Sequence, residues 1–179
     1  MSYPRYILIA MALVLTACGD LYPSGEDKRA PVDSSTIGAS VGQIAPPFSL
    51  FDTLGNPVEI PTELFGTRGI VLYFTMWCPI CESHMDHLRK YVIPNYPNVK
   101  FFIVDYVSGT VELSRTAQEE HFYTDLTVLA DSSQEVLSLY DATMGTTVVI
   151  ENDGSDGVVR MNEDYKDSVK LTTTLDALL

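Results

Sequence analysis

The feature that most constrains this chain is a pair of cysteines, Cys78 and Cys81, directly after the apolar run 69–75. The β-branched and aromatic residues of this run predict a buried strand, and the segment 79–91 is expected to be the helix that follows it. Unpaired backbone N–H groups at a helix N-terminus stabilise a thiolate there. Two thiols with C-x-x-C spacing at a strand-to-helix junction therefore predict a redox pair.

The chain from residue 41 to 179 alternates between strand and helix signals. We expect strands at 48–51, 57–60, 69–75, 99–105, 126–130, 146–151 and 158–161, and helices at 79–91, 111–121, 132–140 and 167–179. Strands 48–51 and 57–60 are expected to form an N-terminal hairpin, and strands 146–151 and 158–161 a C-terminal one. Pro94 and Pro97 are expected to end the helix 79–91, and Ser132 with Glu135 is expected to form a capping box. This order predicts an α/β fold in which a central mixed β-sheet carries helices on both faces.

Residues 1–17 have the pattern of a secretory signal. Arg5 precedes an apolar stretch, 7–15, that is too short to span a bilayer and is followed by small residues; a buried first helix is the alternative. The sequence Leu15-Thr16-Ala17-Cys18 resembles the lipobox of bacterial lipoproteins, in which the signal is removed and the cysteine is acylated. Several acyl chains on Cys18 would hold the protein durably at a membrane surface.

Residues 18–40 are expected to form a flexible tether, because they are rich in proline, glycine, serine and acidic residues and lack apolar periodicity. A flexible chain of this length has a root-mean-square reach of roughly 25 Å. The expected organisation is therefore a signal peptide at 1–17, a tether at 18–40 and one globular domain at 41–179. The residue after Cys18 is Gly19, not aspartate, which favours the outer membrane if the enterobacterial sorting rule applies.

The net charge of −13, from 11 basic and 24 acidic residues, argues against nucleic acid as a partner, since nothing in the chain forms a basic stripe that could neutralise phosphates. Most of this charge is expected to lie on a solvated surface, and recognition of a partner by an acidic patch is the alternative. With Cys18 assigned to lipid, two of the 3 cysteines remain, and both belong to the C-x-x-C pair. In an exported chain, dedicated partners set the redox state of such a pair.

Several motifs in this order resemble the thioredoxin superfamily, and more narrowly its membrane-tethered thiol-disulfide oxidoreductases and the redoxins of the AhpC/TSA type. The residues that carry the resemblance are 41–50 (VGQIAPPFSL), Gly55, 73–81 (YFTMWCPIC), 129–131 (LAD) and 146–150 (TTVVI) before Gly154. The resemblance covers nearly all of 41–179. Its most specific part is the W-C-P-x-C sequence after a buried strand.

The resemblance implies that Cys78 is the nucleophile and Cys81 the resolving thiol. It also implies that the substrates are disulfides or dithiols of other proteins, that a membrane protein could supply electrons, and that no bound organic cofactor is needed. The expected start of the helix is consistent with these two roles, because Cys78 would lie in the first turn and Cys81 one turn further in. Trp77 would shield the thiol from water, and Pro79 would preorganise the helix start. We expect a monomer, lipid-anchored on the periplasmic side of the bacterial cell envelope.

Gly145 is the first departure from the superfamily pattern. A cis-proline usually precedes the residue that corresponds to Thr146, packs against the dithiol and presents no N–H group. A cis bond before a residue other than proline costs about 2.5 to 4 kcal/mol, so the Met144–Gly145 bond is expected to be trans. Substrate docking by backbone pairing is therefore in question.

His84 is the second departure, because the tethered cytochrome-maturation reductases usually have a glutamate three residues after the second cysteine. Three interpretations are open for His84. It could move protons for the dithiol as the glutamate would. It could join Cys78, Cys81 and His87 in a copper or zinc site, with Met85 as a soft neighbour, which would make the protein a copper-handling chaperone. It could also be an ordinary surface histidine, and this is the favoured interpretation of His87.

The remaining candidates are weaker. Thr75, three residues before Cys78, echoes the T-x-x-C of peroxiredoxins and would suggest a thiol peroxidase with antioxidant activity, but Val71 stands where that family has proline. Asp105 and Asp131 end strands and could lie near the dithiol. His121 is expected to be a charge or cap at a helix C-terminus. Glu119 and Glu120 are expected to be solvated helix charges.

Overall fold

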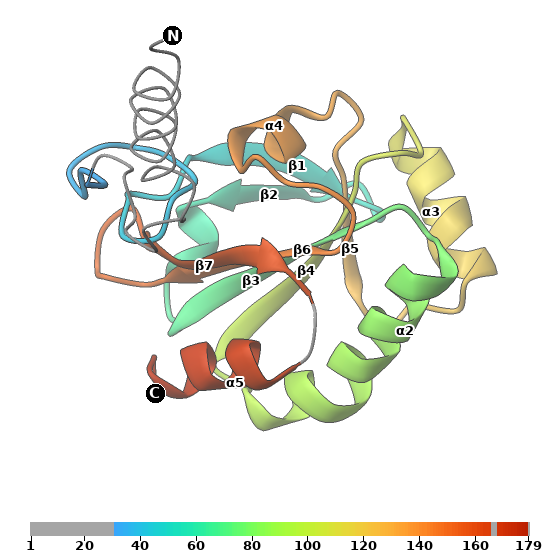
Figure 1. Ribbon diagram of the computed structural model, residues 1–179. Helices are drawn as coiled ribbons and strands as arrows, with labels where there is room; N and C mark the ends of the chain where they lie inside the picture. Colours follow the sequence, from blue (N-terminus) through green and yellow to red (C-terminus); the bar gives the residue numbers. More distant parts are fainter. Residues whose placement is uncertain (1–30, 166–167, 179) are drawn as a thin grey trace, which may run out of the picture. The chain divides into compact units, whose positions relative to one another are not determined.

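The computed structural model describes residues 31–165 and 168–178 (Figure 1). The strands are β1 (Phe48–Asp52), β2 (Pro57–Ile60), β3 (Gly69–Thr75), β4 (Val99–Asp105), β5 (Thr127–Ala130), β6 (Thr146–Glu151) and β7 (Val158–Asp164). The helices are α2 (Pro79–His87), α3 (Val111–Glu120), α4 (Glu135–Leu139) and α5 (Ser168–Asp176), with the short helical segments η2 (Thr62–Leu64), η3 (Leu88–Val92) and η4 (Ile93–Asn95). The expected strands and helices are all present within the described residues, with shifts of a few residues at their ends.

The strands form one seven-stranded sheet in the order β2-β1-β5-β4-β3-β6-β7. Strand β3 runs parallel to β4 and antiparallel to β6, and β4 runs parallel to β5. The hairpins β1–β2 and β6–β7 are antiparallel. The predicted mixed sheet with two hairpins is therefore confirmed.

Two hydrophobic cores cover the two faces of the sheet. On one face, Met85 of α2, Leu88 of η3 and Leu171 of α5 pack against the sheet. On the other face, Val136 and Tyr140, in and just after α4, pack with the N-terminal hairpin and η2. Figure 1 shows this division, with α2 and α5 below the sheet and α4 above it. All seven residues of β3 are buried, because both faces of this central strand are covered.

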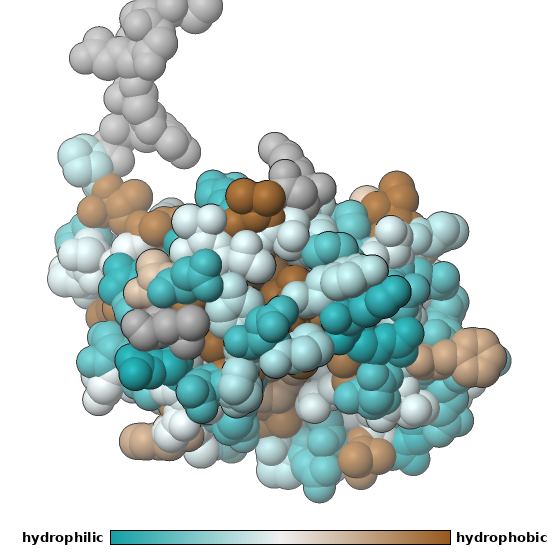
Figure 2. Space-filling view, turned by 90° about the horizontal axis from the view of Figure 1, so that it is seen from below, coloured by the Kyte–Doolittle hydropathy of each residue, from teal (hydrophilic) through white to brown (hydrophobic). Residues whose placement is uncertain are grey.

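The surface over α2 and α5 is mostly hydrophilic, with separate hydrophobic residues between the polar ones (Figure 2). None of the described helices is long and apolar enough to cross a membrane.

Helical backbone continues past the expected end of the helix 79–91. It passes through the wide turn of η3 and the tight turn of η4, and Pro94 lies inside η4. Proline has no N–H group, and its ring clashes with the carbonyl four residues earlier in a regular α-helix. The change from α-helix to a wider turn accommodates Pro94. Helical backbone then ends at Asn95, between the two prolines that were expected to end it, so the expected end at Tyr91 was wrong.

The predicted capping box of Ser132 and Glu135 is also wrong. Helix α4 begins at Glu135, and its N-cap is Gln134, which has a φ of 59° and makes no capping bond with its side chain. The buried carboxylate of Asp131 accepts hydrogen bonds from the backbone N–H groups of Val136 and Leu137, at 3.3 and 2.8 Å. An aspartate further back therefore caps this helix.

The compact unit starts at Val32, earlier than the expected boundary at residue 41. Ile44 forms β-bridges with Ile37 and Val158, and the side-chain amide of Asn162 donates a hydrogen bond to the carbonyl of Ala39. Residues 32–40 thus pack onto the domain and do not belong to a tether. The signal peptide, Cys18 and the rest of the tether lie outside the described residues.

Candidate active site at the start of helix α2

Cys78 is the N-cap of α2, and its sulfur accepts a hydrogen bond from the backbone N–H of Cys81 at 3.3 Å. Both cysteines are free thiols, with their sulfurs 2.9 Å apart. Cys78 is partly exposed, whereas Cys81 is fully buried one turn into the helix. Pro79 occupies the first helical position, where no N–H donor is lost. This geometry gives one accessible thiol and one protected thiol within reach of each other.

The surroundings of Cys78 favour its thiolate. Desolvation by burial tends to raise the pKa of this thiol. Hydrogen bonds from the Cys81 thiol and from the backbone N–H groups of Cys81 and Ile80 outweigh desolvation and lower the pKa below its ordinary value. The partly exposed sulfur of Cys78 is therefore favoured as the nucleophile of the pair.

Trp77 shapes the turn between β3 and α2. Its φ is 57°, in the left-handed region, and its backbone N–H donates to the hydroxyl of the buried Thr75 at 3.1 Å. The indole ring stacks on the ring of His121, with centroids 5.3 Å apart and planes 18° apart. His121 Nδ1 lies 2.6 Å from Glu82 Oε1, so the stack connects the turn to both α2 and the end of α3.

His121 is the C-cap residue of α3, as the sequence predicted, but its contacts with Trp77 and Glu82 were not foreseen. The two aspartates that end strands, Asp105 and Asp131, are buried and cap backbone N–H groups. Asp105 Oδ1 accepts from the backbone of residues 107 and 108 at 3.0 and 3.1 Å. Glu119 and Glu120 are exposed, as expected.

Met144 brings a third sulfur to the dithiol. Its Sδ lies 3.4 Å from Cys78 Sγ, although the two residues are 66 positions apart. Sequence reasoning missed this residue. The available signal was its place directly before Gly145, the position expected to face the dithiol.

Gly145 follows Met144 in a turn with a φ of 81°. Within the described residues the cis peptide bond is Ile60–Pro61, so Met144–Gly145 is trans, as expected. The Gly145 N–H donates to the Phe74 carbonyl at 2.9 Å, and the Gly145 carbonyl accepts from the Tyr165 N–H at 2.8 Å. The donor that glycine restores is thus used inside the protein. The next residue, Thr146, is buried, and its hydroxyl accepts from the Thr143 N–H at 2.9 Å.

His84 lies beside Gly145 and bonds to a buried tyrosine. Its Nδ1 is 3.0 Å from the Tyr73 hydroxyl, and its ring contacts the Tyr165 ring at 4.6 Å between centroids. A Cβ atom placed on Gly145 would lie 3.7 Å from the same nitrogen and 4.0 Å from the hydroxyl. The two departures from the superfamily pattern therefore meet at one point.

Burial and charge set the protonation of this pair. Desolvation, followed by the neighbouring charge of His87, lowers the pKa of His84, so the neutral imidazole is favoured. Desolvation raises the pKa of the Tyr73 hydroxyl well above its ordinary value, and the charge of Cys81 and a hydrogen bond with its sulfur add to this. Tyr73 is thus a neighbour of both the buried thiol and a neutral imidazole. The sequence signal for Tyr73 was a buried phenol, which needs a hydrogen-bond partner.

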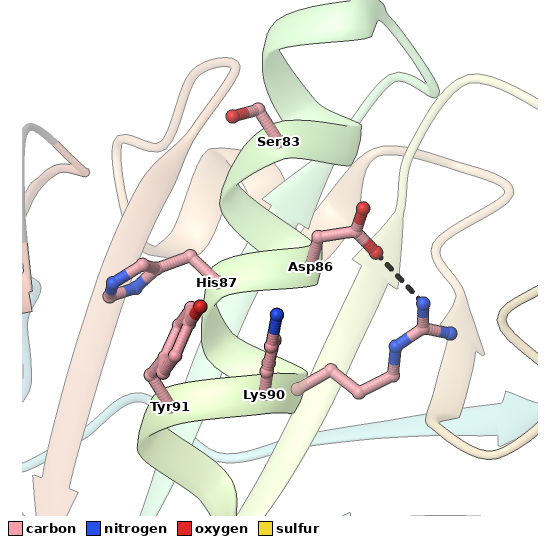
Figure 3. A pocket seen from close by; sticks show the side chains of 6 residues that line it. Ser83, Asp86, His87, Lys90 and Tyr91 are labelled. Atoms are coloured by element: carbon pink, nitrogen blue, oxygen red, sulfur yellow. Dashed lines mark hydrogen bonds and ion pairs between the residues drawn. The ribbon is translucent and has the colours of Figure 1, made fainter.

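His87 bonds to a tyrosine, and no contact joins it to either cysteine among the described residues. Its Nδ1 bonds to the Tyr165 hydroxyl at 2.7 Å, and its ring packs near Tyr91. It lines a shallow pocket on the outer side of the helix, with the Asp86–Arg89 ion pair on the other side (Figure 3). In the part of the chain that the structure describes, no group of three or more His, Cys, Asp or Glu residues could hold a metal ion. The set of Cys78, Cys81, His84 and His87 is therefore not assembled.

Comparison with known families decides the classification. The model described as the AhpC/TSA family matches residues 41–160, about two thirds of the chain. The chain belongs to the AhpC/TSA family. Among curated proteins, none matches the chain at a significant level.

Solved structures place this AhpC/TSA member in the thioredoxin-like fold, as the sequence predicted. A proposed protein disulfide isomerase from Bacteroides thetaiotaomicron is 18% identical with a TM-score of 0.64, and the match covers 80% of this chain and 92% of that one. A thiol-disulfide oxidoreductase from Bacteroides fragilis is 23% identical with a TM-score of 0.60, covering 76% and 100%. A secreted disulfide oxidoreductase from Mycobacterium tuberculosis is 21% identical with a TM-score of 0.54, covering 73% and 95%.

Proposed function

We propose that this protein is a thiol-disulfide oxidoreductase that exchanges disulfides with other proteins through Cys78 and Cys81. The observation that carries the proposal is the position of the Cys78 sulfur at the N-cap of α2, 2.9 Å from the buried sulfur of Cys81. The helix N-terminus favours the thiolate that attacks, and burial keeps Cys81 for the second step. The names of structurally similar proteins, three of which are described as disulfide isomerase or oxidoreductases, support the same class.

The reaction has two exchanges. The Cys78 thiolate attacks one sulfur of a partner disulfide, a mixed disulfide forms, and the other partner sulfur leaves as a thiolate that takes a proton. Cys81 then loses its proton and attacks Cys78 Sγ, which releases the second partner thiol and closes the Cys78–Cys81 disulfide. The partner gains two electrons, and the dithiol loses two. The reverse sequence oxidises a partner dithiol.

Tyr73 and His84 serve the second exchange. The Tyr73 hydroxyl bonds to His84 Nδ1 and also interacts with the Cys81 sulfur. As Cys81 becomes a nucleophile, its proton passes to Tyr73, and Tyr73 gives its own proton to the neutral imidazole. This assigns to His84 the proton-moving role that a glutamate has in the tethered cytochrome-maturation reductases.

The partner approaches over an apolar rim. Ile80, between the two cysteines, is 56% exposed, and Met144 is 37% exposed next to Cys78. Exposed apolar side chains beside a reactive sulfur suit an extended segment of another protein. The backbone of Gly145 is paired internally, so docking relies on these side chains.

The proposed location rests on the N-terminal sequence. A signal at 1–17 and lipid on Cys18 would place the domain in the cell envelope, where a membrane electron donor can keep a reductase reduced. The secreted relative from Mycobacterium tuberculosis supports an extracytoplasmic site. We propose a monomer without a bound organic cofactor. A thiol peroxidase has less support, because Val71 stands where peroxiredoxins have proline.

Trapping of partners tests the proposal. A Cys81→Ser variant should accumulate mixed disulfides through Cys78 with envelope proteins, which diagonal electrophoresis reveals. Cys78→Ser is the matched control and should trap none. Wild-type protein should also catalyse insulin reduction by dithiothreitol, and the proposal is wrong if both assays give the level of the Cys78→Ser control.

A further inference from the structure

Three sulfurs meet at the mouth of the site. Cys78 Sγ lies 2.9 Å from Cys81 Sγ and 3.4 Å from Met144 Sδ. The cysteines come from the start of α2, and Met144 comes from the loop before β6. Met144 and Cys78 are both reached by solvent. An ion can therefore approach this cluster without opening the fold.

We propose that the reduced protein binds one copper(I) ion through Cys78, Cys81 and Met144. Thiolate and thioether sulfurs are soft ligands, and copper(I) is the common biological ion that prefers them. This inference rests on the proposed function in one respect, because copper binding requires the reduced form of the Cys78–Cys81 pair. The structure assigns Met144 as the third ligand in place of the histidines that the sequence suggested.

The histidines are engaged elsewhere. His84 Nδ1 bonds to the hydroxyl of Tyr73, and His87 Nδ1 bonds to the hydroxyl of Tyr165. Zinc usually takes four ligands in a tetrahedron, and the described residues hold no group of three or more His, Cys, Asp or Glu suited to a metal. A three-sulfur set without nitrogen or oxygen therefore selects copper(I) over zinc.

Small movements would complete the coordination. Three sulfurs about 2.3 Å from a metal in a trigonal plane lie about 4 Å from one another. The thiols must therefore separate by about 1 Å, and Met144 has three rotatable bonds that let its sulfur follow. Two thiolates and one copper(I) ion together carry a single negative charge. The N-terminus of α2 stabilises this negative charge.

Binding is coordination without electron transfer. Both thiols lose a proton to solvent, two copper–thiolate bonds and one copper–thioether bond form, and copper stays monovalent. The Cys78–Cys81 disulfide has no thiolate to offer. Copper binding and disulfide formation therefore exclude each other.

An anaerobic titration of the reduced chain with copper(I), in competition with bicinchoninate, tests the inference. We expect one equivalent bound, loss of binding in Cys78→Ser and Cys81→Ser, and an affinity lowered about tenfold or more in Met144→Leu. Met76→Leu is the matched control, because Met76 is exposed to a similar degree, and its affinity should equal that of the wild type. X-ray absorption should show sulfur neighbours only.

Three outcomes would overturn the inference: equal affinities in Met144→Leu and Met76→Leu, nitrogen or oxygen in the copper shell, or equal binding by the disulfide form. Circular dichroism of each variant shows that it is folded. The metal-free insulin assay separates the two proposals. Exchange without copper binding rejects only this inference, and copper binding without exchange rejects only the proposed function.

Discussion

His84 Nδ1 lies 3.0 Å from the Tyr73 hydroxyl, beside the main chain of Gly145, where an added Cβ would approach both groups within 4.0 Å. Glycine therefore leaves this contact free of a neighbouring side chain. The absence of the proline and the presence of the histidine are two parts of one local arrangement.

Replacing Tyr73 by phenylalanine should slow the resolving step selectively. Ellman's reagent separates the steps in a Cys18→Ser chain, because attack by Cys78 releases one coloured thiolate and attack by Cys81 releases the second. Loss of the proton relay should slow the second release about tenfold to a hundredfold and leave the first unchanged.

Tyr165→Phe is the control for this experiment. It removes the hydroxyl that bonds to His87 but keeps the ring next to His84. A variant that merely loosens the site would slow both releases of thiolate. If Tyr73→Phe slows the first release as much as the second, the result argues against the relay. The pKa of His84 is lowered, so its imidazole stays neutral, and able to accept a proton, at lower pH than an ordinary histidine. The second release in the wild-type protein should therefore stay fast down to a correspondingly lower pH.

The reactivity of Cys78 should depend on Cys81. The pKa of the Cys78 thiol is lowered by hydrogen bonds that include one from the Cys81 thiol, against the opposing effect of desolvation. The alkylation rate of Cys78 should therefore fall as the pH drops through the lowered pKa of its thiol. This midpoint should lie below the midpoint of a cysteine in the unfolded chain. Cys81→Ala removes one of these hydrogen bonds and should raise the midpoint.

Iodoacetamide labelling across pH, read at the Cys78 peptide by mass spectrometry, measures both midpoints. The urea-unfolded chain supplies the reference for an unperturbed thiol. A folded midpoint equal to that reference would show that the helix start does not favour the thiolate.

Restoring the superfamily proline at position 145 should destabilise this chain. The φ of 81° is far from the value that a proline ring imposes, and proline would remove the N–H that bonds to Phe74. We expect Gly145→Pro to lower the free energy of unfolding by about 2 to 4 kcal/mol in urea titrations.

Gly154→Ala separates strain from the lost hydrogen bond. Gly154 has a φ of 89°, and an added Cβ there would meet no atom within 4 Å. Its cost should be about 1 kcal/mol. Equal costs for the two variants would mean that the Gly145 N–H contributes little.

The sequence predicted the sheet, the hairpins and the position of both cysteines because these depend on local signals. An apolar run makes β3, and the proline after Cys78 starts α2. Position 145 was also correctly identified as a trans glycine. Such features need only residue type and short spacing.

The contacts that complete the site could not be predicted in this way. Met144 reaches Cys78 across 66 positions, and His121 reaches Glu82 across 39. These pairs depend on how α3 and the loop before β6 close over the sheet, which no local pattern encodes. The predicted cap of α4 was wrong for a similar reason, because the carboxylate of Asp131, and not the hydroxyl of the nearer Ser132, accepts the hydrogen bonds of the helix start.

The stack of Trp77 on His121 should be measurable through fluorescence, because Trp77 is the single tryptophan of the chain. His121→Ala removes the stacked ring and the bond to Glu82, and His121→Phe keeps a ring but removes that bond. We expect His121→Ala to cost about 0.5 to 1.5 kcal/mol of unfolding free energy and His121→Phe to recover part of it. Emission should shift to longer wavelength in His121→Ala as the indole gains water. If Glu82→Gln destabilises the fold as much as His121→Ala and leaves the emission unchanged, then the bond between His121 and Glu82 holds the turn, and the stacked ring does not.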